Sequence, residues 1–85
     1  MSQEHDSSLS ELAQSFKPGI YKHFKGGMYE ALCVGRNSEV KEEEFVIYRS
    51  LDKGHVWVRP IKMFFDEVDR DGYKGPRFQW VGDTQ

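Results

Sequence analysis

Long apolar runs, cysteine and an excess of charge are what this sequence has least of. No stretch approaches the ~20 apolar residues that a helix needs to cross a bilayer. The first six residues also lack the basic start and apolar centre of a signal peptide. The one cysteine, Cys33, cannot form a disulfide within the chain. These absences lead us to expect a cytoplasmic protein that does not engage a membrane.

The charges are nearly balanced but unevenly placed. The chain has 12 Lys and Arg against 14 Asp and Glu, a formal net charge of −2. Three of the acids and none of the bases lie in residues 1–16, so the net charge from Lys17 onward is +1. Proteins that bind nucleic acid non-specifically usually have a strong basic excess. The sequence therefore argues against that function, although a local basic patch remains compatible with it.

Aromatic residues are what the chain has in abundance, with six Phe, four Tyr and two Trp among 85 residues. This content is too high for a disordered chain, and the length suffices for one small hydrophobic core. We expect a tail and short helix over residues 1–17, one domain over 18–81 and a tail over 82–85.

Helical spacing occurs near the N-terminus. Ser8 and Glu11 fit a capping box, and Pro18 stops the pattern, which predicts an amphipathic helix over residues 8–16. Because so short a helix is marginal alone, its apolar stripe must pack on the domain or on a partner chain. The main residues of that stripe are Leu9, Leu12 and Phe16.

The rest of the chain reads as short strands separated by turns. Gly26 and Gly27 predict a two-residue hairpin, whose register places His23 opposite Glu30. The predicted strands span residues 20–24, 28–36, 45–49, 56–59 and 77–81, and a helical turn over 61–65 plugs one end with Met63 and Phe64. This pattern predicts an all-β fold, a small SH3-like barrel of about five strands.

Several segments in the same order resemble one known family. They are residues 18–29 (PGIYKHFKGGMY), 46–49 (VIYR), 57–60 (WVRP), 63–64 (MF) and 76–78 (PRF). Together they resemble the bacterial family described as domain of unknown function 1653. The resemblance implies an SH3-like barrel and brings with it no established activity.

No residue pattern predicts catalysis or a metal site. A Cys33–His23 pair would be a competent nucleophile, but the expected register keeps the two apart, and we expect a buried, structural Cys33. Asp69 and Asp71 begin like a calcium loop, but Tyr73 stands at the third ligand position and the final Glu is missing. We expect no catalytic residue, no metal and no cofactor.

The remaining candidate chemistry is a set of aromatic and arginine side chains. Aromatic rings stack on planar ligands, and guanidinium groups hold phosphate or carboxylate through paired hydrogen bonds. The alternative is that these side chains fill the barrel and pair across strands. The seven candidate binding residues are Tyr21, His23, Tyr29, Tyr48, Trp57, Arg59 and Arg77, and Phe78 belongs to the same set.

Two functional hypotheses follow. The first is a non-enzymatic binding module for a nucleotide, a single-stranded nucleic-acid segment such as RNA, or an extended peptide. The second is an assembly protein that forms a homodimer through the N-terminal helix or a sheet edge.

Overall fold

The computed structural model describes residues 9–83, in which strands are the main regular structure and the helices are few and short. The elements are α1 (Glu11–Gln14), β1 (Gly19–His23), β2 (Met28–Arg36), β3 (Glu44–Ser50), β4 (Val56–Pro60), α2 (Ile61–Phe64), β5 (Glu67–Arg70), β6 (Tyr73–Pro76) and β7 (Phe78–Gly82). The all-β class is therefore confirmed. The described helices are too short to cross a membrane.

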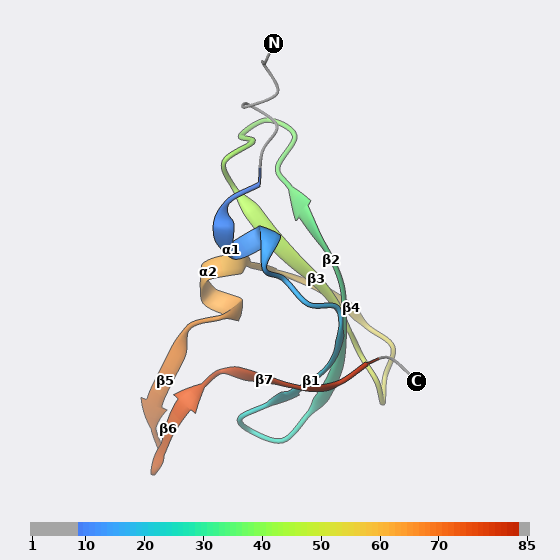
Figure 1. Cartoon of the computed structure of the whole chain (residues 1–85). Helices are drawn as coiled ribbons and strands as arrows, with labels where there is room; N and C mark the ends of the chain where they lie inside the picture. Colours follow the sequence, from blue (N-terminus) through green and yellow to red (C-terminus); the bar gives the residue numbers. More distant parts are fainter. Residues whose placement is uncertain (1–8, 84–85) are drawn as a thin grey trace.

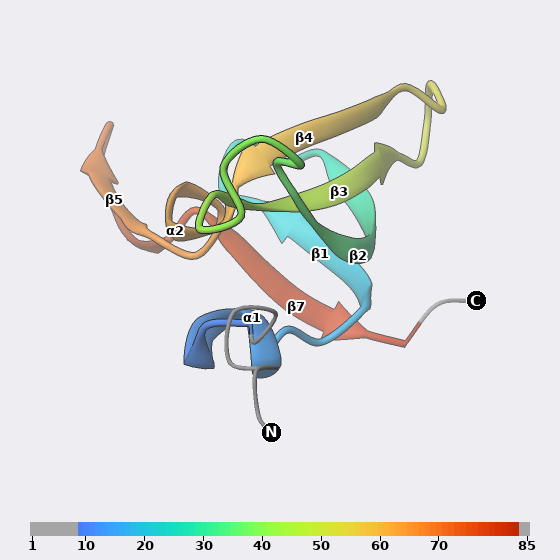
Figure 2. The ribbon, with the colours of Figure 1, turned by 90° about the horizontal axis from the view of Figure 1, so that it is seen from above.

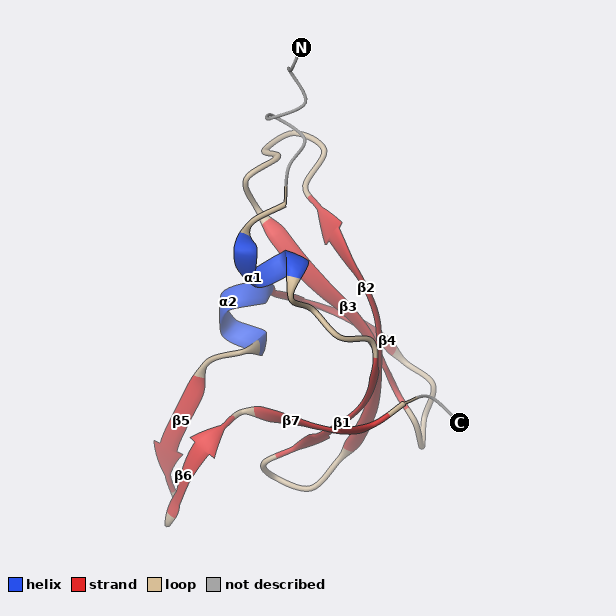
Figure 3. Ribbon diagram, in the orientation of Figure 1, coloured by secondary structure: helices blue, strands red, loops and turns tan. Residues whose placement is uncertain are grey.

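The strands form two antiparallel sheets. One has five strands in the order β4-β3-β2-β1-β7, and the other is the β5–β6 hairpin. The five-stranded sheet curves around α1 and α2, which lie on its concave side, while the β5–β6 hairpin projects away (Figures 1 and 3). The projection is also visible from above (Figure 2). The barrel is not closed, because β4 and β7 stand at opposite edges of the five-stranded sheet.

The β5–β6 hairpin was not predicted as strands, although its turn was. Asp71 has φ 56° and Gly72 has φ 80°, the positive angles of a tight hairpin turn. The strands themselves carry little apolar alternation, since Val68 is the buried residue of β5 and β6 is mostly polar, glycine and proline. A strand of four residues with one buried side chain gives no periodic signal.

The β1–β2 connection is longer than the predicted two-residue turn. β1 ends at His23 and β2 begins at Met28, so four residues connect them. The His23 N–H donates to the Gly27 carbonyl (2.8 Å), and the Gly26 N–H donates to the His23 carbonyl (2.8 Å). Gly26 has φ 117°, whereas Gly27 does not have a positive φ. The predicted turn was therefore wrong in length.

The register changes with the turn. Tyr21 pairs with Tyr29, and Ile20 pairs with Glu30. The prediction that His23 faces Glu30 was wrong, because Glu30 pairs with Ile20. The difference between positions 23 and 20 is odd, and a register shift by an odd number of residues moves a side chain to the opposite face of the sheet. The observed register brings Tyr29 to the face that carries Tyr21 and His23.

The core lies between the concave face and α2. Phe64 is fully buried, and its ring stacks on Phe78 with centroids 4.2 Å apart. It also packs edge-on against Tyr21 (5.2 Å) and Tyr48 (5.3 Å). Met63, the other predicted plug residue, is 46% exposed because adjacent positions of a helix face different directions. Of the two predicted plug residues, Phe64 is therefore the one that fills the core.

The N-terminal helix is shorter than predicted. Its cap is Ser10, and the predicted cap, Ser8, lies outside the described residues, as does the rest of 1–8. The Glu44 carboxylate accepts hydrogen bonds from the Ser10 N–H (2.8 Å) and hydroxyl (2.6 Å), which lowers its pKa. The apolar stripe packs against the core of its own chain through Leu9, Leu12 and Phe16.

The convex face of the sheet has exposed apolar side chains. Cys33 pairs with Ile47 and Ile47 pairs with Val58, which is 63% exposed. Cys33 is exposed as well, so the prediction of a buried cysteine was wrong. A register irregularity after Ala31 and the lack of a covering layer among the described elements explain its exposure.

Candidate functional site

Every strand of the five-stranded sheet contributes to a hollow of about 200 Å³ on the concave face. Strand pairing sets its residues side by side, since His23 pairs with Phe78 and Tyr48 pairs with Trp57. We call this site the aromatic hollow. Its lining residues are Phe78 from β7, His23 from β1, Tyr29 from β2, Tyr48 from β3, and Trp57 and Arg59 from β4.

Five of the seven candidate binding residues thus meet at one place, and two do not. Tyr21 is 3% exposed in the core, and its hydroxyl donates to the Lys17 carbonyl (2.7 Å). Burial raises the pKa of the Tyr21 phenol. Arg77 is held by Asp66, with its Nε donating to Oδ1 at 2.8 Å and a second nitrogen donating to Oδ2 at 3.1 Å. Both residues have structural partners, and neither lines the hollow.

The aromatic rings of the hollow divide into a fixed floor and an open rim. Tyr48 and Phe78 are each 4% exposed, with ring centroids 5.4 Å apart in an edge-on arrangement. Tyr29 packs edge-on against both, at 5.5 Å and 5.7 Å. Trp57, in contrast, is 50% exposed. The hollow therefore combines a rigid aromatic floor with one accessible indole.

Arg59 supplies the positive charge of the hollow. Its Nε donates to the Tyr48 hydroxyl (3.1 Å), and its guanidinium carbon lies 5.8 Å from the centre of the Phe78 ring. Arg59 takes no part in the Arg49–Glu30 and Arg77–Asp66 ion pairs of the described residues, although its charge contributes to lowering the pKa of the Asp66 carboxyl. Its remaining N–H groups are available to an acceptor brought by a ligand.

His23 lies in a positive environment. Burial lowers the pKa of its imidazole, and the positive charge of Arg59, followed by those of Arg77, Lys25 and Arg70, lowers it further. Its Nδ1 accepts a hydrogen bond from the Lys25 N–H (3.1 Å), an assignment that places the proton of the neutral ring on Nε2. His23 thus offers the hollow a neutral ring within a field that favours anions.

The structure separates Cys33 and His23, the two residues considered as a nucleophile pair. His23 lies on the concave face, whereas Cys33 lies on the convex face. Within residues 9–83, no group of three or more His, Cys, Asp or Glu side chains is placed to hold a metal ion. What the described residues assemble is stacking surface and hydrogen-bond donors.

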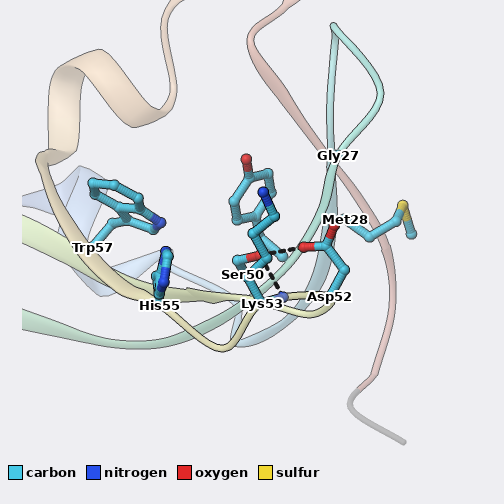
Figure 4. Close-up of a pocket in the computed structure, with 8 residues that line it drawn as sticks. Gly27, Met28, Ser50, Asp52, Lys53, His55 and Trp57 are labelled. Carbon is cyan, nitrogen blue, oxygen red and sulfur yellow. Dashed lines mark hydrogen bonds between the residues drawn. The ribbon is translucent and has the colours of Figure 1, made fainter.

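A second hollow has a volume of about 310 Å³ (Figure 4) and shares two lining residues with the first. Tyr29 and Trp57 line both, and the second is completed by the β3–β4 turn, which brings Lys53 and His55. We call it the turn hollow. Neither Lys53 nor His55 was among the candidates, because a charged residue in a glycine-containing turn ordinarily indicates solvent exposure. Phe78, also absent from the seven, lines the aromatic hollow because of its long-range pairing with His23.

The fold and the hollow define a small all-β domain with an aromatic, arginine-containing concave surface. The chain belongs to the family described as Protein of unknown function (DUF1653), whose model matches residues 19–80. It is similar to the crystal structure of a DUF1653 protein from Bordetella bronchiseptica, with 33% identity and a TM-score of 0.76. That match covers 86% of this chain and 96% of the other. No curated protein matches the chain.

Proposed function

We propose that this protein is a small binding module for a nucleotide, whose planar base and negatively charged phosphate the aromatic hollow holds. The observation that carries the proposal is Arg59, which lines the aromatic hollow and forms no ion pair with the described residues. A guanidinium pairs well with phosphate oxygens, and aromatic rings stack on bases.

The size of the hollow supports a module that holds one part of a ligand. At about 200 Å³ it falls below the roughly 300–1,000 Å³ of sites that enclose a whole small molecule. One ring or one charged group fits inside, and the rest of the ligand lies over the rim at Trp57. Recognition of this kind suits binding better than catalysis on an enclosed substrate.

A quaternary ammonium ligand is the main chemical competitor. Four aromatic side chains around one hollow resemble the cages that hold such cations. However, the guanidinium of Arg59 lines the same space, and its positive charge repels a cation. The local field therefore favours an anion.

The test is a titration of the full chain followed by amide chemical shifts. Adenosine monophosphate (AMP) is expected to give saturable shifts in the strands around the hollow, and adenosine or inorganic phosphate alone weaker ones. Arg59→Ala should abolish them, and Arg59→Lys should weaken them because lysine lacks the planar fork. Lys22→Ala removes a positive charge from the exposed side of β1 and should change nothing.

Three outcomes would reject the proposal. One is the absence of saturable shifts with AMP and the other common mononucleotides. Another is tighter binding of choline than of AMP, which would assign the hollow to cations. The last is binding of a peptide that ends in phenylalanine with a free carboxylate when no nucleotide binds.

A homodimer through β4 is the second candidate, favoured by an exposed edge. Val56 and Val58 are 59% and 63% exposed on an edge strand. Size-exclusion chromatography with light scattering tests it, with Val58→Lys expected to shift a dimer toward monomer. A monomer throughout the accessible concentration range would reject it.

A further inference from the structure

The two hollows share part of their lining, from β2 and β4. Tyr29 and Trp57 line both, and Trp57 is 50% exposed. A ligand that fills both hollows must therefore pass beside the indole of Trp57. In Figure 4 the side chains of Trp57, His55 and Lys53 stand on the same side of the β3–β4 connection.

The turn hollow has its own recognition chemistry. The His55 ring packs edge-on against Trp57 with centroids 6.1 Å apart, and Lys53 forms no ion pair within residues 9–83. The Ser50 hydroxyl donates to the Asp52 carboxylate (2.7 Å), which lowers the pKa of Asp52, and the neighbouring charge of Lys53 lowers it further. The hollow thus offers one ammonium, one carboxylate and three rings, those of Tyr29, His55 and Trp57.

This combination favours a base and a single phosphate over a chain of phosphates. Lys53 can neutralise one phosphate, whereas Asp52 repels additional negative charge close to it. The Asp52 carboxylate can instead accept hydrogen bonds from a ribose hydroxyl or from the amino group of a base. Rings at Trp57 and His55 provide stacking surface for that base.

We infer that the ligand comprises two bases joined through a phosphate, with one base in each hollow, an inference that rests on the proposed function of the aromatic hollow. Arg59 and Lys53 stand in different hollows, both of which include Trp57, so the linking phosphate passes beside that indole. The chemistry is shared by a free dinucleotide and by a stretch of single-stranded nucleic acid. The near-neutral domain suits such a short contact better than a long one.

The test compares AMP, the dinucleotide ApA and hexaadenylate in one fluorescence titration. Trp80→Phe provides the background, because it leaves Trp57 as the one tryptophan of the chain. ApA is expected to bind at least about tenfold more tightly than AMP, the gain from one further stacked base. Tighter binding of hexaadenylate than of ApA would identify single-stranded nucleic acid as the source, and equal binding a free dinucleotide.

Lys53→Ala gives a readout specific to the phosphate. It should lower the ratio of ApA to AMP affinity and reduce the slope of log affinity against log salt for hexaadenylate by about 0.7, the value for one phosphate contact in a single strand. Lys22→Ala, the matched charge change on the other face, should alter neither quantity.

The inference and the proposed function fail in different ways. If ApA binds no more tightly than AMP, or if Lys53→Ala leaves the salt slope unchanged, the two-base ligand is rejected and a one-base ligand stands. If neither AMP, ApA nor hexaadenylate binds, both are rejected together.

Discussion

The two ends of the concave face are built from the same kind of side chain and differ in what covers them. At one end α2 places Phe64 over Phe78 and Tyr21, and the rings are buried. At the other end α2 does not reach, and Tyr29, Trp57 and their neighbours line the open hollows. Aromatic content alone therefore does not distinguish the proposed binding surface from the core. The two ends differ in whether a described element covers the rings.

The largest expected effect lies at the covered end. Phe64→Ala should lower the free energy of unfolding by about 3–5 kcal/mol, the usual cost of removing a fully buried ring. Chemical denaturation measures the loss, with Phe64→Leu as the milder variant if the alanine variant does not fold. Trp57→Ala at the open end should cost less than about 1 kcal/mol, since half the side chain is already exposed. Equal losses would contradict the distinction between the two ends.

The next largest effects on stability are expected at two arginines, Arg77 and Arg59. Arg77→Ala should destabilise the protein by about 1–2 kcal/mol, because it leaves Asp66 without its paired hydrogen bonds and Asp66 is partly exposed. Arg59→Ala should cost less, about 0.5–1 kcal/mol for one hydrogen bond to Tyr48. Denaturation curves measure both, and a larger cost for Arg59 would show that it serves mainly to stabilise the fold.

The pH dependence of the pair at Asp66 has a defined sign. The hydrogen bonds from Arg77 lower the pKa of the Asp66 carboxyl in the folded state. Its stabilising contribution is therefore present above the unfolded pKa of about 3.9 and is lost as the pH falls through the folded pKa. Stability measured between pH 3 and 6 should fall less steeply in Asp66→Asn than in the wild type. Parallel curves would contradict this role.

Tyr48 touches both ends and should show a mixed effect. Its ring packs against Phe64 at 5.3 Å, while its hydroxyl accepts from Arg59 Nε. Tyr48→Phe keeps the ring and removes one hydrogen bond, so stability should fall by about 0.5–1.5 kcal/mol. AMP affinity should fall as well, because Arg59 loses the partner that orients it. A stability loss without any loss of affinity would separate Tyr48 from the hollow.

The smallest expected effect is the titration of His23. Burial and neighbouring positive charges lower the pKa of its imidazole in the folded state. The unfolded chain then binds the proton more readily, so stability should decrease as the pH falls from about 6.5 through the folded pKa. Proton NMR of the imidazole gives the pKa directly, and His23→Gln should flatten the stability curve in that window. A His23 pKa above its ordinary value would contradict the positive field in the hollow.

Local patterns in the sequence located most elements but not their pairing. The apolar alternation of residues 56–59 and the β-branched and aromatic run over residues 45–49 identify strands without knowledge of the fold. The β1–β2 register depends on a turn whose hydrogen bonds involve Gly26 and Gly27 in different roles, and dipeptide preference alone cannot show this. The pairing of His23 with Phe78 joins the ends of the domain, beyond the reach of any local pattern.

The sequence predicted the chemistry of the candidate site but could not determine which of the candidate residues form it. The alternation of side chains along the strand predicted that Trp57 and Arg59 lie on one face. Both line the aromatic hollow, as predicted. Nothing local shows that Asp66 lies beside Arg77, or that Phe64 covers Tyr21. Those partners lie on other elements, and the tertiary fold determines which arginine and which tyrosine stay available.

Because all five strands of the larger sheet supply side chains to the aromatic hollow, the site exists only when the whole sheet has paired. A ligand there recognises the native state and gains nothing from a partly unfolded chain. At one hundred times its Kd it would add ~2.7 kcal/mol to stability. A screen of small molecules for an increase in Tm would therefore test directly whether the hollow binds a ligand.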